Sequence, residues 1–193
     1  MSRLAFQFAG SPSSNDHQVR PLVDGVDLLD LIETDSLGID PPEFFRQPAL
    51  LSGGRLPIGR CSRGVVGCDD VFADVVRTDD SVTWQLPANR RYAFEPAGYS
   101  SCIKSGADDT GWESAERTAE RLASSLDFST VEEHGYRFGW ASARISRGRM
   151  TLSFWKEDTQ RLFEIGWDEG NPEDAAKQVR RWIIEFDRRD HEF

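Results

Sequence analysis

The sequence has no hydrophobic run long enough to cross a membrane. A helix that spans a bilayer needs about 20 consecutive apolar residues, and every apolar stretch in these 193 residues is interrupted well before that length. The opening stretch, Met1 to Phe8, is too short and too interrupted for a signal peptide. We therefore predict a cytoplasmic protein that has no membrane partner.

Cysteine and histidine are scarce, with three of each. Cys61, Cys68 and Cys102 form an odd and sparse set, which is typical of reduced thiols inside a cell rather than a secreted disulfide framework. Structural zinc usually takes four thiolate or imidazole ligands, often supplied as closely spaced C-x2-4-C pairs. Six residues separate Cys61 from Cys68, which is wider than such a pair. We predict that both are free of metal and that the chain carries no cofactor.

Basic residues are outnumbered, with 23 Lys and Arg against 33 Asp and Glu, so the formal net charge is -10. Such a field repels nucleic acid phosphates and anionic membranes and attracts cationic partners. Only three of the 23 basic residues are lysines, which leaves 20 arginines. We attribute this bias to a GC-rich coding genome. Because of the negative net charge, we exclude nucleic acid as a partner.

Motifs for nucleophilic catalysis are also missing. Gly98-Tyr99-Ser100-Ser101-Cys102 does not match the G-x-S-x-G serine elbow. His17 and His191 lie in segments that we predict to be loop or tail, and His134 follows two acids at an expected turn. We therefore predict no catalytic residue.

Pairs of adjacent acidic residues are the most informative feature present. Most of them fall where the hydrophobic pattern breaks, which places the acid in loops between strands or helices. The pairs are Asp69-Asp70, Asp79-Asp80, Asp108-Asp109, Glu132-Glu133, Glu157-Asp158, Asp168-Glu169 and Glu173-Asp174.

Aromatic residues supply the core. The 12 Phe, 6 Trp and 3 Tyr bring a large apolar area per residue, which argues against disorder despite the charge. The length suits one substantial domain or two small ones. We predict a single α+β domain over residues 1–193, with a subdivision near residue 108 as the alternative.

The last third predicts a three-stranded antiparallel meander covered by a C-terminal helix. Large apolar residues alternate along each expected strand, and Asn171-Pro172 is typical of a helix start. The strand sets are Tyr136, Phe138 and Trp140; Met150, Leu152 and Phe154; and Phe163, Ile165 and Trp167. The apolar face of the helix is Ala175, Val179, Trp182, Ile183 and Phe186.

The first two thirds predict antiparallel hairpins. Good β-formers flank turn residues in 71–86, and the Asp24-Gly25 pair accepts the backbone of a type I′ turn. Pro21 predicts an edge strand. Residues 51–67 are rich in glycine and predict an irregular segment, and Thr110 to Glu113 resembles a capping box that opens the next helix.

One segment is similar to a known family. Residues 56–61, 64–68, 82–84 and 92–95 together with Tyr99 resemble uncharacterised actinobacterial proteins with a C-x-C-G-x-x-G-C segment, a V-x-W strand, then F-x-F and Tyr. The resemblance covers about a quarter to a third of the chain. Arg63 stands in place of the family's middle cysteine, so a thiolate cluster is incomplete here. The resemblance implies a bacterial, high-GC origin and brings no activity.

These observations favour a non-enzymatic intracellular binding protein. Its acidic loops would engage a basic protein partner, in the manner of an immunity protein or antitoxin that neutralises a cationic toxin. The expected partner-binding residues are Asp69, Asp70, Asp79, Asp80, Asp108 and Asp109. The alternatives are a small enzyme that uses the Cys61 to Asp70 loop or an acidic cleft, and a structural or assembly subunit.

Overall fold

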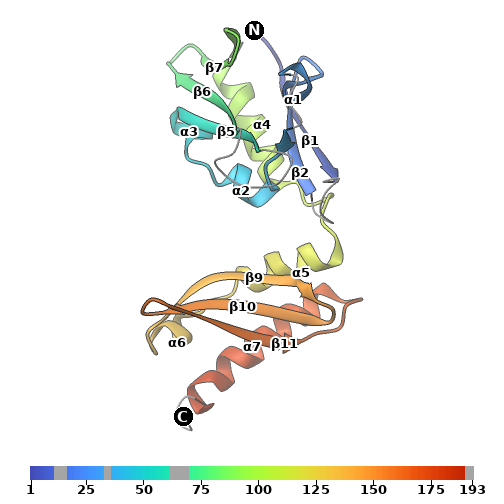
Figure 1. Ribbon diagram of the computed structural model, residues 1–193, viewed down its shortest axis with the longest axis vertical. Helices are drawn as coiled ribbons and strands as arrows, with labels where there is room; N and C mark the ends of the chain where they lie inside the picture. Colours follow the sequence, from blue (N-terminus) through green and yellow to red (C-terminus); the bar gives the residue numbers. More distant parts are fainter. Residues whose placement is uncertain (11–16, 33–35, 61–69, 190–193) are drawn as a thin grey trace. The chain divides into compact units, whose positions relative to one another are not determined.

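The chain folds as an α+β protein with antiparallel sheets, which confirms the predicted fold class. The computed structural model describes residues 1–10, 17–32, 36–60 and 70–189, and side chains up to residue 186. Backbone contacts divide the chain into two compact units, Met1–Trp112 and Glu113–Phe193. Figure 1 shows the elements of each unit. Within the described ranges, no helix is both long and apolar enough to cross a bilayer.

The first unit contains two antiparallel sheets and short helices. Its strands are β1 (Leu4–Gly10), β2 (His17–Val23), β3 (Val26–Asp27), β4 (Leu37–Gly38), β5 (Gly54–Arg60), β6 (Val71–Arg77), β7 (Val82–Leu86) and β8 (Arg90–Phe94). Its helices are α1 (Leu28–Leu31), α2 (Pro41–Phe45), α3 (Ala49–Ser52) and α4 (Pro96–Asp108). The strand orders are β1-β2-β3 and β4-β5-β6-β7-β8.

Backbone hydrogen bonds join the first sheet to both ends of the five-stranded sheet. The Val19 N–H of β2 donates to the Ile39 carbonyl just after β4, at 2.8 Å. The Ser2 N–H, just before β1, donates to the Ala93 carbonyl of β8 at 2.7 Å. The sheets therefore curve around one core as an incompletely closed barrel.

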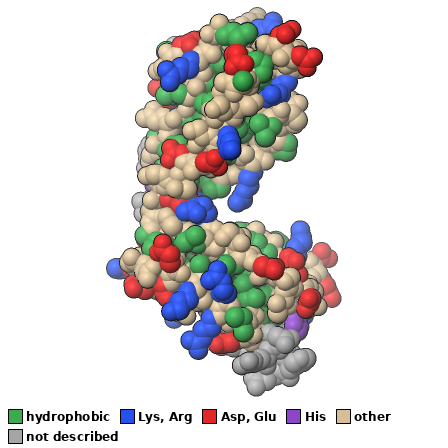
Figure 2. Space-filling model, turned by 180° about the vertical axis from the view of Figure 1, so that it is seen from behind, with side chains coloured by type: hydrophobic (Ala, Val, Ile, Leu, Met, Phe, Trp, Pro, Cys, Tyr) green, Lys and Arg blue, Asp and Glu red, His purple; other side chains and the backbone are tan. Residues whose placement is uncertain are grey.

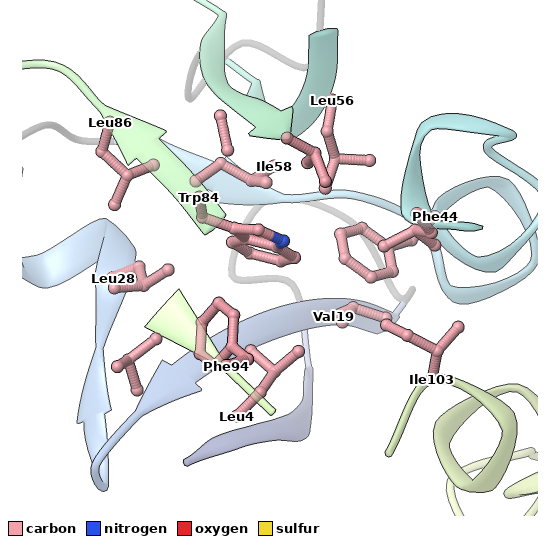
Figure 3. Close-up of a cluster of buried hydrophobic side chains, with 14 of the residues drawn as sticks. Leu4, Val19, Leu28, Phe44, Leu56, Ile58, Trp84, Leu86, Phe94 and Ile103 are labelled. Atoms are coloured by element: carbon pink, nitrogen blue, oxygen red, sulfur yellow. The ribbon is translucent and has the colours of Figure 1, made fainter. Parts of the chain in front are cut away.

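Trp84 lies at the centre of this core (Figure 3). Its side chain is fully buried, and its indole N–H donates to the hydroxyl of Tyr99 on α4 at 3.1 Å. The rings of Phe94 and Tyr99 lie within about 6 Å of the Trp84 ring, with Phe94 in an edge-to-face contact. The hydrogen bond and the ring contacts fix α4 against the barrel.

The hairpins predicted in this unit are confirmed, including β6–β7 and the turn at Asp24-Gly25. Both turn residues have positive φ, 52° and 83°, as a type I′ turn requires.

The predicted edge position of Pro21 is wrong, because β2 lies between β1 and β3. Since Val19 donates away from β1, the nitrogen of Pro21 two residues later also faces away from β1. On that side β3 pairs only with Leu22 and Val23, so Pro21 lies beyond the end of the short β3 ladder.

Two further predictions for the first unit are corrected. Residues 54–60, placed in an irregular segment, form the strand β5. Thr110 does not cap the next helix, because the side chain of Ser114 accepts the Arg117 N–H at the start of α5 (Ala115–Ser124). Glu113 instead binds Thr118 and Arg121 on that helix. The C-x6-C segment from Cys61 to Cys68 lies outside the described residues.

The second unit is the predicted meander with helices on one face. Its elements after α5 are α6 (Ser129–Glu132), β9 (Tyr136–Ser146), β10 (Arg149–Lys156), β11 (Thr159–Gly166) and α7 (Pro172–Arg189). The strand order is β11-β10-β9, and all pairs are antiparallel. Ala175, Val179, Ile183 and Phe186 of α7 are buried against Met150, Leu152 and Phe154 of β10, and half-buried Trp182 packs against them.

Trp140 does not share a face with Tyr136 and Phe138, contrary to the predicted alternation. The register against β10 shifts between Ser153 and Phe154, where the partners change from Trp140 to Phe138. The extra residue is Gly139, and this β-bulge reverses the alternation along β9. Trp140 therefore lies on the open face of the sheet with 38% of its surface exposed.

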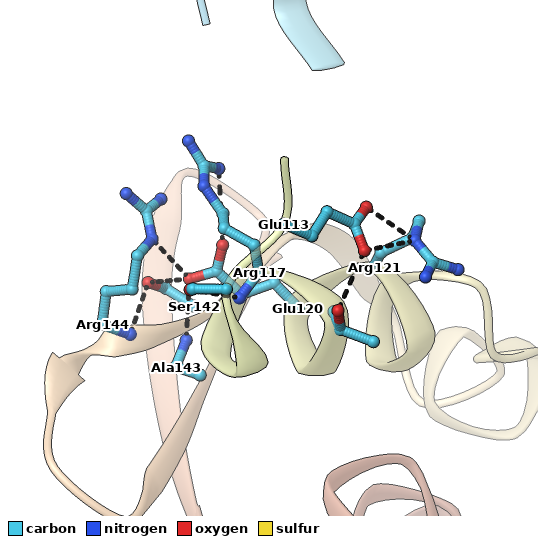
Figure 4. Close-up of polar contacts among 9 residues, drawn as sticks. Glu113, Arg117, Glu120, Arg121, Ser142, Ala143 and Arg144 are labelled. Atoms are coloured by element: carbon cyan, nitrogen blue, oxygen red, sulfur yellow. Dashed lines mark hydrogen bonds and ion pairs between the residues drawn. The ribbon is translucent and has the colours of Figure 1, made fainter. Parts of the chain in front are cut away.

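A buried carboxylate joins α5 to the meander (Figure 4). Glu120 is 7% exposed, and its Oε1 accepts from the Ser142 hydroxyl, the Ala143 backbone N–H and the Arg144 guanidinium, each at 2.9 Å. Arg117 lies on the other carboxylate oxygen at 3.5 Å. Because Glu120 accepts a backbone N–H of β9, α5 covers that edge of the sheet.

Candidate functional site

The acidic residues predicted to bind a partner lie at three separate places. Asp79 and Asp80 are exposed in the β6–β7 turn, and Asp108 and Asp109 are exposed at the end of α4. Asp70 is half-buried at the start of β6, and Asp69 lies outside the described residues.

The first unit does not bring these residues together. Asp70 and the Asp79-Asp80 turn flank opposite ends of the seven-residue strand β6, which spans roughly 20 Å. Figure 2 likewise shows acidic side chains dispersed among basic and apolar ones on the visible face. Among the described residues, no group of three or more His, Cys, Asp or Glu is placed to hold a metal ion.

A groove lies between β1 and α4 in the first unit. Its volume is about 530 Å³, within the range of roughly 300–1,000 Å³ that ligand sites occupy. Its lining comes from residues before and along β1, the end of β8, and one face of α4. The lining residues are Ser2, Arg3, Leu4, Ala5, Phe6, Phe8, Phe94, Glu95, Gly98, Tyr99, Ser101, Cys102, Ser105, Gly106 and Asp109.

One wall of the groove is the outer edge of β1. The backbone carbonyl of Arg3 accepts the Asp24 N–H, so the backbone N–H and C=O of Arg3 point toward β2. Backbone N–H and C=O groups of successive residues point to alternate sides of a strand. Those of Leu4, Phe6 and Phe8 therefore point away from β2, toward the α4 side. The Leu4 carbonyl there accepts the Cys102 thiol at 3.3 Å. The groove thus presents backbone donors and acceptors of Phe6 and Phe8.

The opposite wall is a helix face made of small residues. Gly98, Ser101, Cys102, Ser105 and Gly106 recur at spacings of three and four, which places them on one face of α4. Side chains this short leave the surface hollow and offer two hydroxyl groups. A partner's side chains can therefore reach the helix itself.

Close packing holds α4 in this position. A Cβ added at Gly106 would lie 2.6 Å from the Phe45 ring and 2.9 Å from the Phe6 ring, so only glycine permits this approach. Phe6 also packs edge-on against Phe44 and Phe45, with ring centroids 5.4 and 5.1 Å apart. Phe6, which lines the groove, is therefore held within an aromatic cluster.

The charged residues of the groove lie near its ends. Glu95 caps α4, and hydrogen bonds from the Ala97 and Gly98 backbone lower its pKa below the usual value for a glutamate. Asp109 follows the last turn of α4, and its Oδ1 accepts the Gly111 N–H at 2.8 Å. Arg3 is the one basic residue among the lining residues described above. The groove carries net negative charge.

The groove lacks the pairing that nucleophilic catalysis needs. Cys102 is its strongest nucleophile, but burial raises the pKa of the thiol, which already donates to the Leu4 carbonyl. A reactive cysteine needs a lowered pKa or an adjacent base. Among the described lining residues there is no histidine to serve as that base.

A second depression lies on the outer face of β5, β6 and β7. It is lined by Arg55, Asp70, Phe72, Asp74, Gln85, Leu86 and Pro87. Arg55 stacks on the Phe72 ring at 3.8 Å from its centroid, so its cation is engaged in a cation–π contact. Of the predicted acidic residues that the structure describes, only Asp70 lines this depression.

Asp109 is one of the sequence-predicted acidic residues and lines the groove, but the groove itself was not predicted because the sequence pattern did not indicate α4. The helix has only two buried large residues, Tyr99 and Ile103, which is too few for a periodic apolar signal. Its start was readable, since Glu95 caps the helix and Pro96 stands at its first position. A capping side chain followed by proline is also the pattern that predicts α7 at Asn171-Pro172.

No protein-family model, curated protein or solved structure matches the chain.

Proposed function

We propose that this chain is a non-enzymatic binding protein whose β1–α4 groove receives an extended segment of a basic protein partner. The observation that carries the proposal is the groove itself, which joins a strand edge bearing backbone hydrogen-bonding groups to a hollow helix face. Extended segments bind such surfaces through main-chain hydrogen bonds, and pockets for their side chains give specificity.

Charge supports a basic partner. Glu95 and Asp109 outnumber Arg3 in the groove, and the whole chain carries -10. Long-range attraction raises association rates for partners of opposite charge. An immunity-like or antitoxin-like role, in which a cationic toxin is held inactive, is the form of this function that we propose.

Selection from a displayed library of random peptides tests the groove without a known partner. We expect the full chain to enrich basic sequences and Ser105→Trp to lose their binding, because the indole would fill the hollow between α4 and β1. Lys104→Trp is the matched control, since Lys104 is an exposed neighbour on α4 that does not line the groove. Enriched peptides that bind the Ser105→Trp chain as tightly as the native chain would refute the assignment.

Substitutions at two acidic sites distinguish charges that only speed association from charges that contact the partner. We expect Asp79→Asn with Asp80→Asn, in the exposed β6–β7 turn, to slow association and leave dissociation nearly unchanged, since distant charges steer more than they hold. Asp109→Asn keeps the oxygen that accepts the Gly111 N–H but removes charge from the groove, so it should also speed dissociation.

The dependence of the association rate on salt concentration is a second test of electrostatic attraction. The association rate should fall as the Debye length shortens from about 30 Å at 0.01 M to about 8 Å at 0.15 M salt. A rate that responds to neither salt nor these substitutions would leave the acidic surface a solubility feature.

A further inference from the structure

The free edge of the meander in the second unit has features that suit a second copy of this chain. In the strand order β11-β10-β9, each outer strand has an edge with no neighbour among the described strands. The β9 edge is covered, because Glu120 accepts the outward Ala143 N–H. The β11 edge has no comparable cover among the described residues, and Gln160, Leu162 and Glu164 along it are all exposed.

The hairpin geometry shows which backbone groups of β11 face outward. Lys156 pairs with Thr159 across the two-residue turn Glu157-Asp158, where Glu157 has a φ of 53°. The pair that closes such a turn is hydrogen-bonded, so the backbone groups of alternate residues from Thr159 onward point to β10. Those of Gln160, Leu162 and Glu164 therefore point outward, a row of donors and acceptors that templates pairing with another strand.

An exposed apolar surface adjoins this edge. Leu162 is 56% exposed and Trp140 is 38% exposed, and in the register they flank Ser153 of the central strand on the face opposite the helices. Half-buried Trp155 follows two residues after Ser153 on the same face. A neighbour that continued the sheet would extend this surface and cover Leu162.

We propose that two copies of this chain pair through antiparallel β11 strands about a two-fold axis at Leu162, forming one continuous six-stranded sheet. In a two-fold pair the same patch serves both copies and must complement itself. With the axis at Leu162, each Leu162 faces its counterpart, and Gln160 faces Glu164 of the other copy, a neutral donor against a carboxylate. On the helix side Arg161 faces Phe163 of the other copy, which suits a cation–π contact.

Other registers are less complementary. An axis at Glu164 or at Arg161 would place identical charges directly opposite each other, which is destabilising. An axis at Phe163 would set Leu162 against Glu164, an apolar side chain against a charge. An axis at Gln160 would leave few residues of β11 in the pair. The register centred on Leu162 is therefore the one that the side chains favour.

Sedimentation of the full chain over a wide concentration range tests the assembly. We expect a monomer–dimer equilibrium for the native chain. Leu162→Arg should weaken dimerisation about tenfold or more, because it replaces an apolar pair by like charges. Ile184→Arg is the matched control, since Ile184 is 64% exposed and belongs to α7, so its backbone takes no part in the β11 ladder. A native chain that stays monomeric, or a dimer equally stable in both variants, would overturn the proposal.

Cross-linking tests the register independently. Opposed residues in a hydrogen-bonded pair have Cα atoms about 5.5 Å apart, within disulfide range. Leu162→Cys should therefore form a covalent dimer on mild oxidation, beyond the amount that the native chain forms with its own cysteines. Gln160→Cys alone should not, whereas Gln160→Cys combined with Glu164→Cys should. Equal cross-linking of Leu162→Cys and Gln160→Cys would show that the register is wrong.

Discussion

At the scale of single residues, two buried polar contacts anchor helices to sheets. The indole N–H of Trp84 on β7 donates a hydrogen bond to the Tyr99 hydroxyl on α4 at 3.1 Å. The Glu120 carboxylate on α5 accepts hydrogen bonds from Ser142, Ala143 and Arg144 on β9. A buried polar group without its partner is costly, so each contact makes the position of its helix specific.

Removing the Tyr99 hydroxyl should destabilise the first unit. Tyr99→Phe leaves the buried indole N–H of Trp84 without its acceptor, and we expect a loss of about 1–3 kcal/mol in the free energy of unfolding. Urea denaturation followed by tryptophan fluorescence measures it. Tyr92→Phe, at a half-buried position on β8, is the control and should change stability less. Equal effects of the two substitutions would contradict the role of the hydrogen bond.

The same residue predicts a loss of stability in alkali. Burial raises the pKa of Tyr99 to about 12, whereas an unfolded tyrosine has a pKa of about 10. The folded chain therefore keeps the phenol proton over a range where the unfolded chain has lost it. The contribution is fully present below pH 10 and should be lost between about pH 10 and 12, amounting to roughly 2–3 kcal/mol. Stability measured against pH should show this loss in the native chain and a smaller one in Tyr99→Phe.

Glu120→Ala should be among the most damaging substitutions in the second unit. It removes the acceptor from a backbone N–H and from two arginines, and breaking a buried ion pair costs about 3–5 kcal/mol. Thermal unfolding measures the effect. Glu133→Ala, at an exposed position after α6, should stay within about 0.5 kcal/mol of the native chain. A Glu120→Ala chain as stable as this control would reject the network as a structural element.

At the scale of elements, α7 is held by an aromatic cluster. The Trp182 ring lies 5.1 Å from that of Phe163 on β11 and 5.0 Å from that of Phe186 one turn along α7. Each such pair adds to the stabilisation that comes from burying apolar area. The amphipathic pattern that predicts this helix therefore corresponds to real packing on the meander.

Two substitutions on α7 separate packing from exposure. We expect Trp182→Ala to lower the free energy of unfolding by about 3 kcal/mol, the low end for a truncated aromatic because Trp182 is half-buried. Ile184→Ala, two residues away and 64% exposed, should cost no more than about 0.5 kcal/mol. Calorimetry of the two variants compares them directly. Equal melting temperatures would show that α7 does not use this face.

At the scale of the whole molecule, the buried residues form two separate cores. The Trp84 core draws on β1, β2 and β5 to β8 with helices α1 to α4, and the Phe154 core draws on elements from α5 onward. A compact unit with its own core can fold independently. The division at Trp112 and Glu113 therefore predicts two folding units.

Residues 113–193 should fold when produced alone. We expect circular dichroism of this fragment to show mixed helix and strand, and one cooperative thermal transition, because its core is complete without residues 1–112. The isolated fragment with Trp182→Ala should melt at a lower temperature, which tests that the transition reports this core. A fragment without any cooperative transition would mean that the second unit needs the first.

Much of this fold was readable from the sequence by itself. Alternation and turn residues predict the β6–β7 hairpin and the C-terminal meander, and helical spacing after Asn171-Pro172 predicts α7. These elements are local, since each pattern repeats over a few residues and each turn is set by its own backbone preferences. The acidic balance is likewise a property of composition alone.

Tertiary structure decided what local patterns do not encode. The bulge at Gly139 turns Trp140 to the open face, and the bond from Ser2 to Ala93 brings two distant segments together beside α4. The groove exists because Gly106 lets a weakly apolar helix approach Phe6 and Phe45. Which acidic residues share a surface is also decided here, because spatial proximity depends on long-range packing. Asp109 therefore lines the groove, while the equally acidic Asp79-Asp80 turn lies elsewhere.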